Sequence, residues 1–151
     1  MSRLWAFPAV LALAFAVWLA PRAARAEIVL EHAWAQATPP KAAVGRAYVG
    51  ISNRSGETDH LVGVRSDAAL SAEIAGIRIL EDVPNQRRLY NIDIPSERGI
   101  AFAPGGYHIL LRNLKKPLVA GDRIAAELIF EKAGAIPVVF TVEKRPAAPG
   151  R

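Results

Sequence analysis

The sequence predicts an all-β protein, an antiparallel β-sandwich of about eight strands. Three observations predict this fold. Short runs rich in β-branched and aromatic residues recur along the chain, apolar residues alternate within several of them, and clusters of Gly, Pro and Asn separate them. With 52% hydrophobic and 22% charged residues, the composition excludes a disordered chain. The 151 residues allow one ordinary domain with a short appendage.

Period-two alternation supports the individual strands. In residues 89–94, Tyr90, Ile92 and Ile94 are expected on one face, and apolar residues alternate in the same way through 122–130. Such strands bury one face against a second layer of sheet. The predicted strands are 47–52, 60–65, 72–80, 89–94, 100–102, 107–114, 122–130 and 136–142.

Turn residues separate these strands. Residues 53–57 form a polar turn, 104–106 read Pro-Gly-Gly, and 132–135 form a hairpin loop. The prolines within 37–43 predict a loop before the first predicted strand. The alanines of 68–76 are also compatible with a helical turn, and that alternative stays open at this point.

Residues 1–26 predict a secretory signal peptide. Arg3 supplies the positive start, residues 4–20 form an uncharged apolar run, and Ala24-Arg25-Ala26 offers a small–x–small cleavage pattern. The alternative is an uncleaved membrane anchor, for which the run is short and interrupted by Pro8. We therefore expect cleavage, with membrane contact only if the signal is retained.

Cleavage changes the composition. The mature domain is expected over 27–143, followed by a polar Pro/Ala tail over 144–151. It would carry 16 Lys and Arg against 14 Asp and Glu, without the clustered basic footprint of a nucleic-acid-binding protein. The chain has no cysteine and its one methionine is Met1, so the mature protein would contain no sulfur. The Ala/Leu-rich signal and the lack of disulfides favour a bacterial periplasm.

The usual catalytic motifs are absent from the sequence. It contains no G-x-S-x-G, no H-E-x-x-H and no P-loop, and no serine lies near a histidine along the chain. We expect a protein that is not an enzyme.

Five segments resemble, in order through nearly all of the mature chain, the periplasmic copper chaperone family called PCuAC. They are 33–40 with 45–48, 59–64, 104–108, 114–118 and 121–122. The resemblance implies a cupredoxin-like β-sandwich that holds Cu(I) and helps to load the copper centre of cytochrome c oxidase. The implied partners are the copper subunit of that oxidase or another copper chaperone.

The resemblance also implies a copper site. With His108 as the third ligand position of the family, the other positions fall on Ala75, Gln86 and Leu110. Cu(I) prefers thioether, thiolate and imidazole donors, so His108 is the only retained ligand type and Gln86 offers a poorly suited amide oxygen. We expect that this degenerate site does not bind Cu(I) tightly. The alternative for His108 is a structural role in which its ring caps the preceding turn.

Two other histidines remain as candidates. His60 is expected to be a solvated residue at a strand edge, and His32 lies close to the mature N-terminus, where Cu(II) chelation is the alternative. If either lay beside His108, an imidazole site for Cu(II) or Zn(II) would be available.

Arginines accompany the segments that carry the ligand positions. Arg78, Arg87, Arg88 and Arg112 either form a protein-binding surface or lie on a solvated strand face. Two functions follow: a PCuAC-type accessory protein in copper handling, or a copper-independent periplasmic protein-binding module on the same scaffold.

Overall fold

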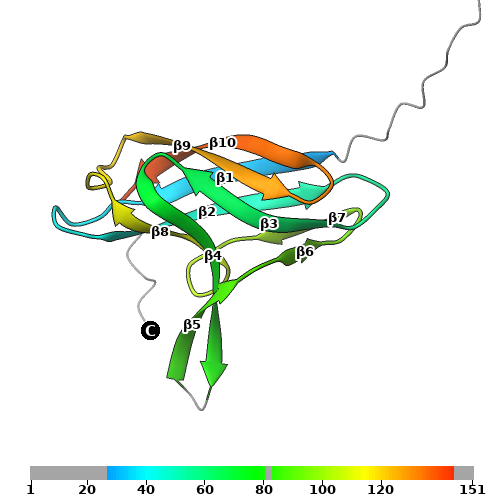
Figure 1. Ribbon diagram of the computed structural model, residues 1–151, viewed down its shortest axis with the longest axis horizontal. Coiled ribbons are helices and arrows are strands. Elements are labelled where there is room, and N and C mark those ends of the chain that lie inside the picture. Colours follow the sequence, from blue (N-terminus) through cyan, green and yellow to red (C-terminus); the bar gives the residue numbers. More distant parts are fainter. Residues whose placement is uncertain (1–26, 81–82, 145–151) are drawn as a thin grey trace, which may run out of the picture.

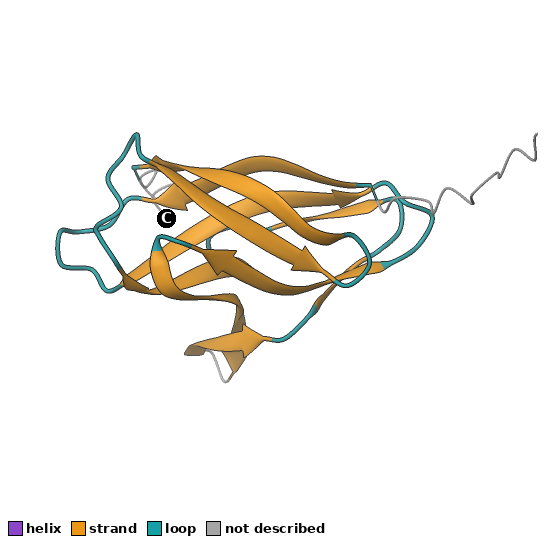
Figure 2. Ribbon diagram, turned by 45° about the horizontal axis from the view of Figure 1, so that its top comes forward, coloured by secondary structure: helices purple, strands orange, loops and turns teal. Residues whose placement is uncertain are grey.

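The computed structural model describes residues 27–80 and 83–144, and these form ten strands without a helix (Figure 1, Figure 2). The all-β prediction is confirmed. The expected signal peptide and all but the first residue of the expected tail lie outside the described residues. In chain order the strands are β1 Ile28–Gln36, β2 Val44–Asn53, β3 Asp59–Ser66, β4 Ala69–Leu80, β5 Val83–Leu89, β6 Ile92–Ile94, β7 Arg98–Ala101, β8 His108–Leu114, β9 Arg123–Phe130 and β10 Gly134–Glu143.

The strands form one hydrogen-bonded path in the order β5-β4-β8-β2-β1-β10-β9-β3-β6, with β7 also paired to β2. Each pair is antiparallel except β1 with β10, which run parallel and align Trp34 with Thr141. The path folds over on itself into two packed layers (Figure 2). The β4–β5 hairpin projects away from these layers and is called the arm below (Figure 1).

Alternate residues of the strands fill one core between the layers. Ile51, Ile109 and Leu111 come from β2 and β8, and they share a cluster with Leu128 and Phe140 of β9 and β10. All five are at most 2% exposed. Since the side chains of a strand point alternately to its two faces, the residues between them lie on the outer face of the sandwich. Among the described residues, no helix has the length and apolar character needed to cross a membrane.

The predicted strand over 89–94 was wrong in one respect. The structure ends β5 at Leu89 and begins β6 at Ile92, because β5 pairs with β4 whereas β6 pairs with β3. Tyr90 is therefore 77% exposed, while Ile92 and Ile94 are buried as expected. The helical alternative for 68–76 is also wrong, because these residues enter β4.

Two strands, β1 and β5, were not predicted. In β1 the pairing register with β2 shifts between Glu31 and Trp34, which is a β-bulge, and His32 there has a φ of 49°. The extra residue interrupts the period of two, so the apolar alternation that would have marked the strand is absent. The bulge also turns Trp34 onto the outer face opposite Tyr48.

Candidate functional site

The four positions suggested for a copper site lie on one face of neighbouring strands. Ala75 of β4 pairs directly with His108 of β8, and Leu110 is two residues further along β8, on the same face. Gln86 of β5 pairs with Ile77, which is two residues after Ala75. The outer face of β4, β5 and β8 therefore carries all four positions, with Gln86 exposed on the arm.

The His108 imidazole is held in one orientation. Its Nδ1 lies 3.0 Å from the carbonyl oxygen of Gly106, and since a carbonyl only accepts, the proton of the neutral ring is on Nδ1. The side chain thus caps the turn before β8, as the structural alternative expects. His108 is only 2% exposed.

The other ring nitrogen of His108 has no partner. Within the described residues, Nε2 is the single buried side-chain nitrogen or oxygen without a hydrogen bond. Burial lowers the pKa of His108, the bond to Gly106 opposes that shift, and the positive charge of Arg46 adds to it. A neutral ring with Nδ1–H bound to a carbonyl and a free Nε2 lone pair is the form in which histidine binds metals.

Apolar and aromatic side chains surround His108. Ala75 and Leu110 are each 1% exposed and offer no donor. The Tyr48 ring lies 6.5 Å from the His108 ring and 4.5 Å from the Trp34 ring, between centroids. Of the four suggested positions only His108 carries a donor suited to Cu(I), and the side chains around it are mainly apolar and aromatic.

The other two histidines are placed elsewhere. His60 of β3 pairs its Nδ1 with Asp93 at 2.8 Å, and its Nε2 lies 4.0 Å from Glu131. His32 is exposed at the bulge of β1. Over residues 27–80 and 83–144, no three His, Cys, Asp or Glu side chains come together as a group that could hold a metal.

An ion cluster borders the same face. Glu73 of β4 has an 11% exposed side chain, and its carboxylate lies 2.6 Å from Nε of Arg112 and 3.4 Å from Nε of Arg88. The structure thus brings two of the four suggested arginines together around a residue that sequence reasoning missed. The only sign of Glu73 in the sequence was its position two residues before Ala75, which puts both side chains on the same face of a strand. The expectation for Arg78 concerns a side chain outside the described part.

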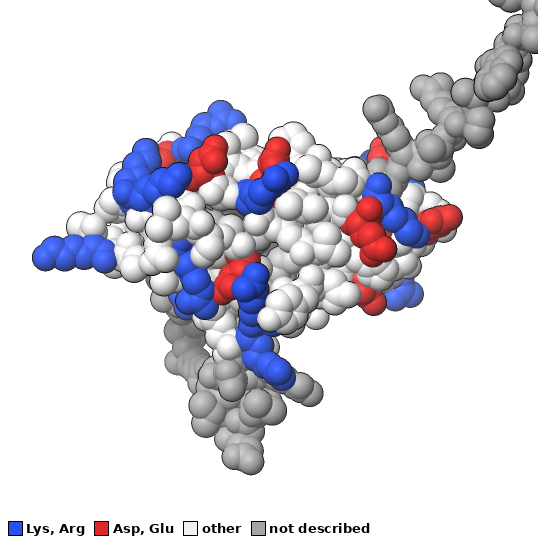
Figure 3. All heavy atoms as spheres, viewed as in Figure 1, with Lys and Arg blue, Asp and Glu red and all other residues white. Residues whose placement is uncertain are grey.

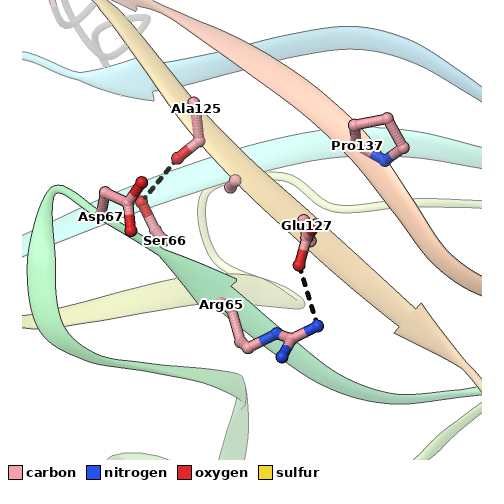
Figure 4. A pocket seen from close by; sticks show the side chains of 7 residues that line it. Arg65, Ser66, Asp67, Ala125, Glu127 and Pro137 are labelled. Carbon is pink, nitrogen blue, oxygen red and sulfur yellow. Dashed lines mark hydrogen bonds and ion pairs between the residues drawn. The ribbon is translucent and has the colours of Figure 1, made fainter.

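A shallow cavity of about 460 Å³ lies on other strands. Figure 4 shows Arg65 and Glu127 pointing toward one another across β3 and β9, where they form a 2.9 Å ion pair. The Ser66 hydroxyl donates to the carbonyl of Ala125, and Pro137 closes one side. Its lining contains no histidine, so it is separate from the site around His108.

Comparisons of the sequence with known proteins identify a family. The sequence profile of the LpqE-like family matches residues 28–142. Lxx21020 of Leifsonia xyli subsp. xyli (strain CTCB07), named as a lipoprotein, is 29% identical over 122 residues, covering 77% of this chain and 69% of that protein.

Solved structures share the fold. The copper-bound PCuAC domain from PmoF2 is 27% identical with a TM-score of 0.66, covering 78% of this chain and 93% of that one. The apo PCuAC domain from PmoF1 is also 27% identical, with a TM-score of 0.67 and coverage of 78% and 94%. The Cu(I) form of DR1885 from Deinococcus radiodurans, at 24% identity, a TM-score of 0.61 and 78% of each chain, has the same fold.

Proposed function

The chain belongs to the LpqE-like family, and from that premise we propose that it is an extracytoplasmic accessory protein of copper handling whose own copper site is degenerate. The observation that carries the proposal is the free Nε2 of His108 on the face where Ala75, Gln86 and Leu110 supply no soft donor. Support for the copper connection comes from the PCuAC domains at 27% identity, one of them copper-bound.

The location follows from the sequence. Residues 1–26 act as a signal peptide that directs the domain to the periplasm, where the mature protein begins near Glu27. There the family role would be delivery of Cu(I) for cytochrome c oxidase assembly, with the copper subunit of that oxidase or another copper chaperone as the partner. No catalytic step is part of this role.

Copper enters this role as cargo. Cu(I) is a soft ion, and one imidazole alone does not define a tight site for it. His108 can supply a single, pre-oriented nitrogen donor, while its neighbours exclude water and offer no further ligand. We therefore expect weak binding by the isolated protein, with the remaining donors supplied by the protein that gives or takes the ion.

A restored site tests the assignment of positions. Cu(I) is titrated against a chromophoric chelator with the wild type, with the triple variant Ala75→His/Gln86→Met/Leu110→Met, and with this variant carrying His108→Ala. We expect competition for Cu(I) only from the triple variant, because only it has two imidazoles and two thioethers on one face. Circular dichroism checks that each variant folds, since Ala75 and Leu110 are buried.

Two results would contradict the proposal. Stoichiometric Cu(I) binding by the wild type that His108→Ala removes would mean that the protein has a tight site of its own. A folded triple variant that fails to compete would mean that these four positions do not form the site.

The second candidate is a copper-independent protein-binding module. Ala75 and Leu110 favour the copper-independent part of it, because both are apolar and offer no donor to a metal ion. Capture of partners from a periplasmic extract separates the two functions. Recovery of an oxidase subunit or a copper protein supports the copper role, whereas an unrelated partner supports the binding module.

A further inference from the structure

We propose that β5 is a docking edge for an acidic, extended segment of a partner protein, which adds to the sheet as a further strand. The docking edge consists of the β5 backbone with the side chains of Arg87, Arg88 and Tyr90. The proposal goes beyond the function above, because it uses neither copper nor the His108 ring.

The backbone of β5 is available for pairing. β5 ends the hydrogen-bonded path of the sheet and, in the described part of the chain, pairs only with β4. An edge strand presents N–H and C=O groups along its free side, and an extended peptide binds by pairing with them. Pro84 has no N–H, so pairing is expected along the Gln86–Leu89 part of β5. The other end of the path is β6, which spans only Ile92–Ile94, so β5 is the longer free edge.

The position of β5 leaves room for a partner. The arm projects from the two packed layers (Figure 1), and at its base Arg88 and Tyr90 line a groove of about 150 Å³ together with residues of β3, which an incoming strand would enter. Lys and Arg side chains gather where the arm leaves the body (Figure 3).

The charge of this edge selects an acidic partner. Arg87 is exposed, and the Arg88 side chain is 59% exposed. Glu73 lies near Arg88 and Arg112 alike, so a single carboxylate is shared between two guanidinium groups. Among the side chains that the structure describes, Arg87 and Arg88 therefore bring two positive charges to the edge, against one carboxylate that is shared with Arg112 of β8. Because adjacent residues of a strand point to opposite faces, Arg87 and Arg88 reach both sides of an added strand.

An aromatic ring completes the edge. The guanidinium of Arg88 lies 5.4 Å from the centroid of the Tyr90 ring, and Tyr90 is 77% exposed. This stacking holds the arginine along the strand and presents the ring as a contact for an apolar side chain. An added strand that carries adjacent acidic residues flanked by β-branched residues fits these features.

The same charges oppose pairing with a second copy of this chain. Two β5 strands brought edge to edge would place arginines near arginines, which is unfavourable. An acidic segment of another protein reverses the sign of that interaction. The surface therefore favours a heterologous partner over self-association.

The test measures binding of a labelled peptide, Thr-Val-Glu-Glu-Val-Thr-Val, by fluorescence anisotropy, with the Lys-Lys version of the peptide as its control. We expect the wild type to bind the acidic peptide only, and Arg87→Glu/Arg88→Glu to weaken binding by about tenfold or more. Arg54→Glu is the matched control, since Arg54 is exposed in the turn after β2 and should leave binding unchanged. Arg87→Gln/Arg88→Gln should give an intermediate loss.

Hydrogen exchange with the acidic peptide present tests the strand addition itself. We expect slower exchange of those amides of Gln86–Leu89 that point away from β4, because these gain hydrogen-bond partners. The measurements use a copper-free buffer, so their outcome is independent of the copper titration. The proposal would be overturned if the Arg54 variant lost binding equally, or if the peptide bound without changing exchange in β5. Exchange is also measured with phosphatidylglycerol vesicles in place of the peptide, and protection of β5 by the vesicles alone would overturn the proposal too.

Discussion

At the residue scale, the two ring nitrogens of His108 differ: one makes a structural hydrogen bond, and the other has no hydrogen-bond partner among the described residues. The bond from Nδ1 to Gly106 explains why a histidine begins β8 after the Pro-Gly-Gly turn. It leaves Nε2 buried and without a partner, at a cost that a purely structural residue would avoid. The ring therefore has one nitrogen that stabilises the turn and one that, among the described residues, makes no hydrogen bond.

Protonation of His108 is expected to destabilise the fold. Because burial lowers the pKa of His108 below its ordinary 6.5, the unfolded chain takes up this proton at a higher pH than the folded chain does. The stabilising contribution of the neutral ring is full above about pH 6.5 and falls as the pH drops from there toward the folded pKa. Thermal unfolding at a series of pH values should show a smaller decrease for His108→Gln than for the wild type. Identical pH profiles would show that another group controls acid stability.

A second prediction concerns the strained backbone of β1. His32 has a φ of 49°, in the left-handed region that favours glycine, and its side chain is exposed. We expect His32→Gly to raise the free energy of unfolding by up to about 1 kcal/mol, measured in urea. Glu31→Gly is the control, because this exposed neighbour has no positive φ and should lose stability. Destabilisation by both substitutions would mean that the His32 side chain supports the bulge.

The sequence proposed four positions that the structure brings onto one face, and whether they form a site stays a prediction. The resemblance placed His108, Ala75, Gln86 and Leu110, and the strand register puts these positions on one face. The role of Glu73 was not predicted, because a glutamate in an apolar strand gives no sign of which arginines will face it. Such ion pairs depend on the register between strands that are distant in sequence.

At the scale of elements, the turn between β9 and β10 is tied to β3 by one buried carboxylate. Asp59 is fully buried, and its oxygens accept hydrogen bonds from the backbone N–H groups of His60, Lys132 and Ala133 at 2.7–2.9 Å. Bonds from N–H groups to a charged acceptor are among the stronger hydrogen bonds in proteins. Asp59 therefore fixes how the β9–β10 hairpin packs beside β3.

Removal of this carboxylate should be costly. We expect Asp59→Ala to lower the free energy of unfolding by on the order of 3 kcal/mol, since three N–H groups lose their acceptor. Denaturation in urea measures the loss. Glu57→Ala, which removes an exposed ion pair with Lys132, is the control and should change stability little. A comparable loss in both variants would show that the exposed pair, rather than the buried carboxylate, holds the turn.

The predictability of strands followed their pairing. Strands β9 and β10 alternate buried residues with less buried ones, whereas β2 and β8 carry continuous buried runs, and all four were predicted from the sequence because they contribute to the core. β1 was not predicted because a bulge interrupts its alternation, and β5 because its polar, arginine-rich sequence belongs to a projecting edge. The pattern of apolar residues along a sequence indicates which residues are buried. Strands that bury few residues, or that contain a register shift, are therefore not predicted from it.

At the scale of the whole molecule, the sequence predicted the fold class but not the order of strands. The structure joins nine strands in one path, with β7 paired to β2 beside it, and the parallel pairing of β1 and β10 makes that path continuous. No local pattern carries that pairing, because the two strands come from opposite ends of the domain. The relative Lxx21020 is named as a lipoprotein, whereas this chain contains no cysteine to carry a thioether-linked lipid.

The pairing of β1 with β10 has a consequence for the order of folding. Residues 34 and 141 must pair before the sheet is complete, and a contact of such long sequence separation forms slowly. A chain that emerges from the ribosome in order therefore keeps its first strand without one neighbour until its last strand is free. The domain therefore cannot complete its sheet before β10, its last strand, has been synthesised.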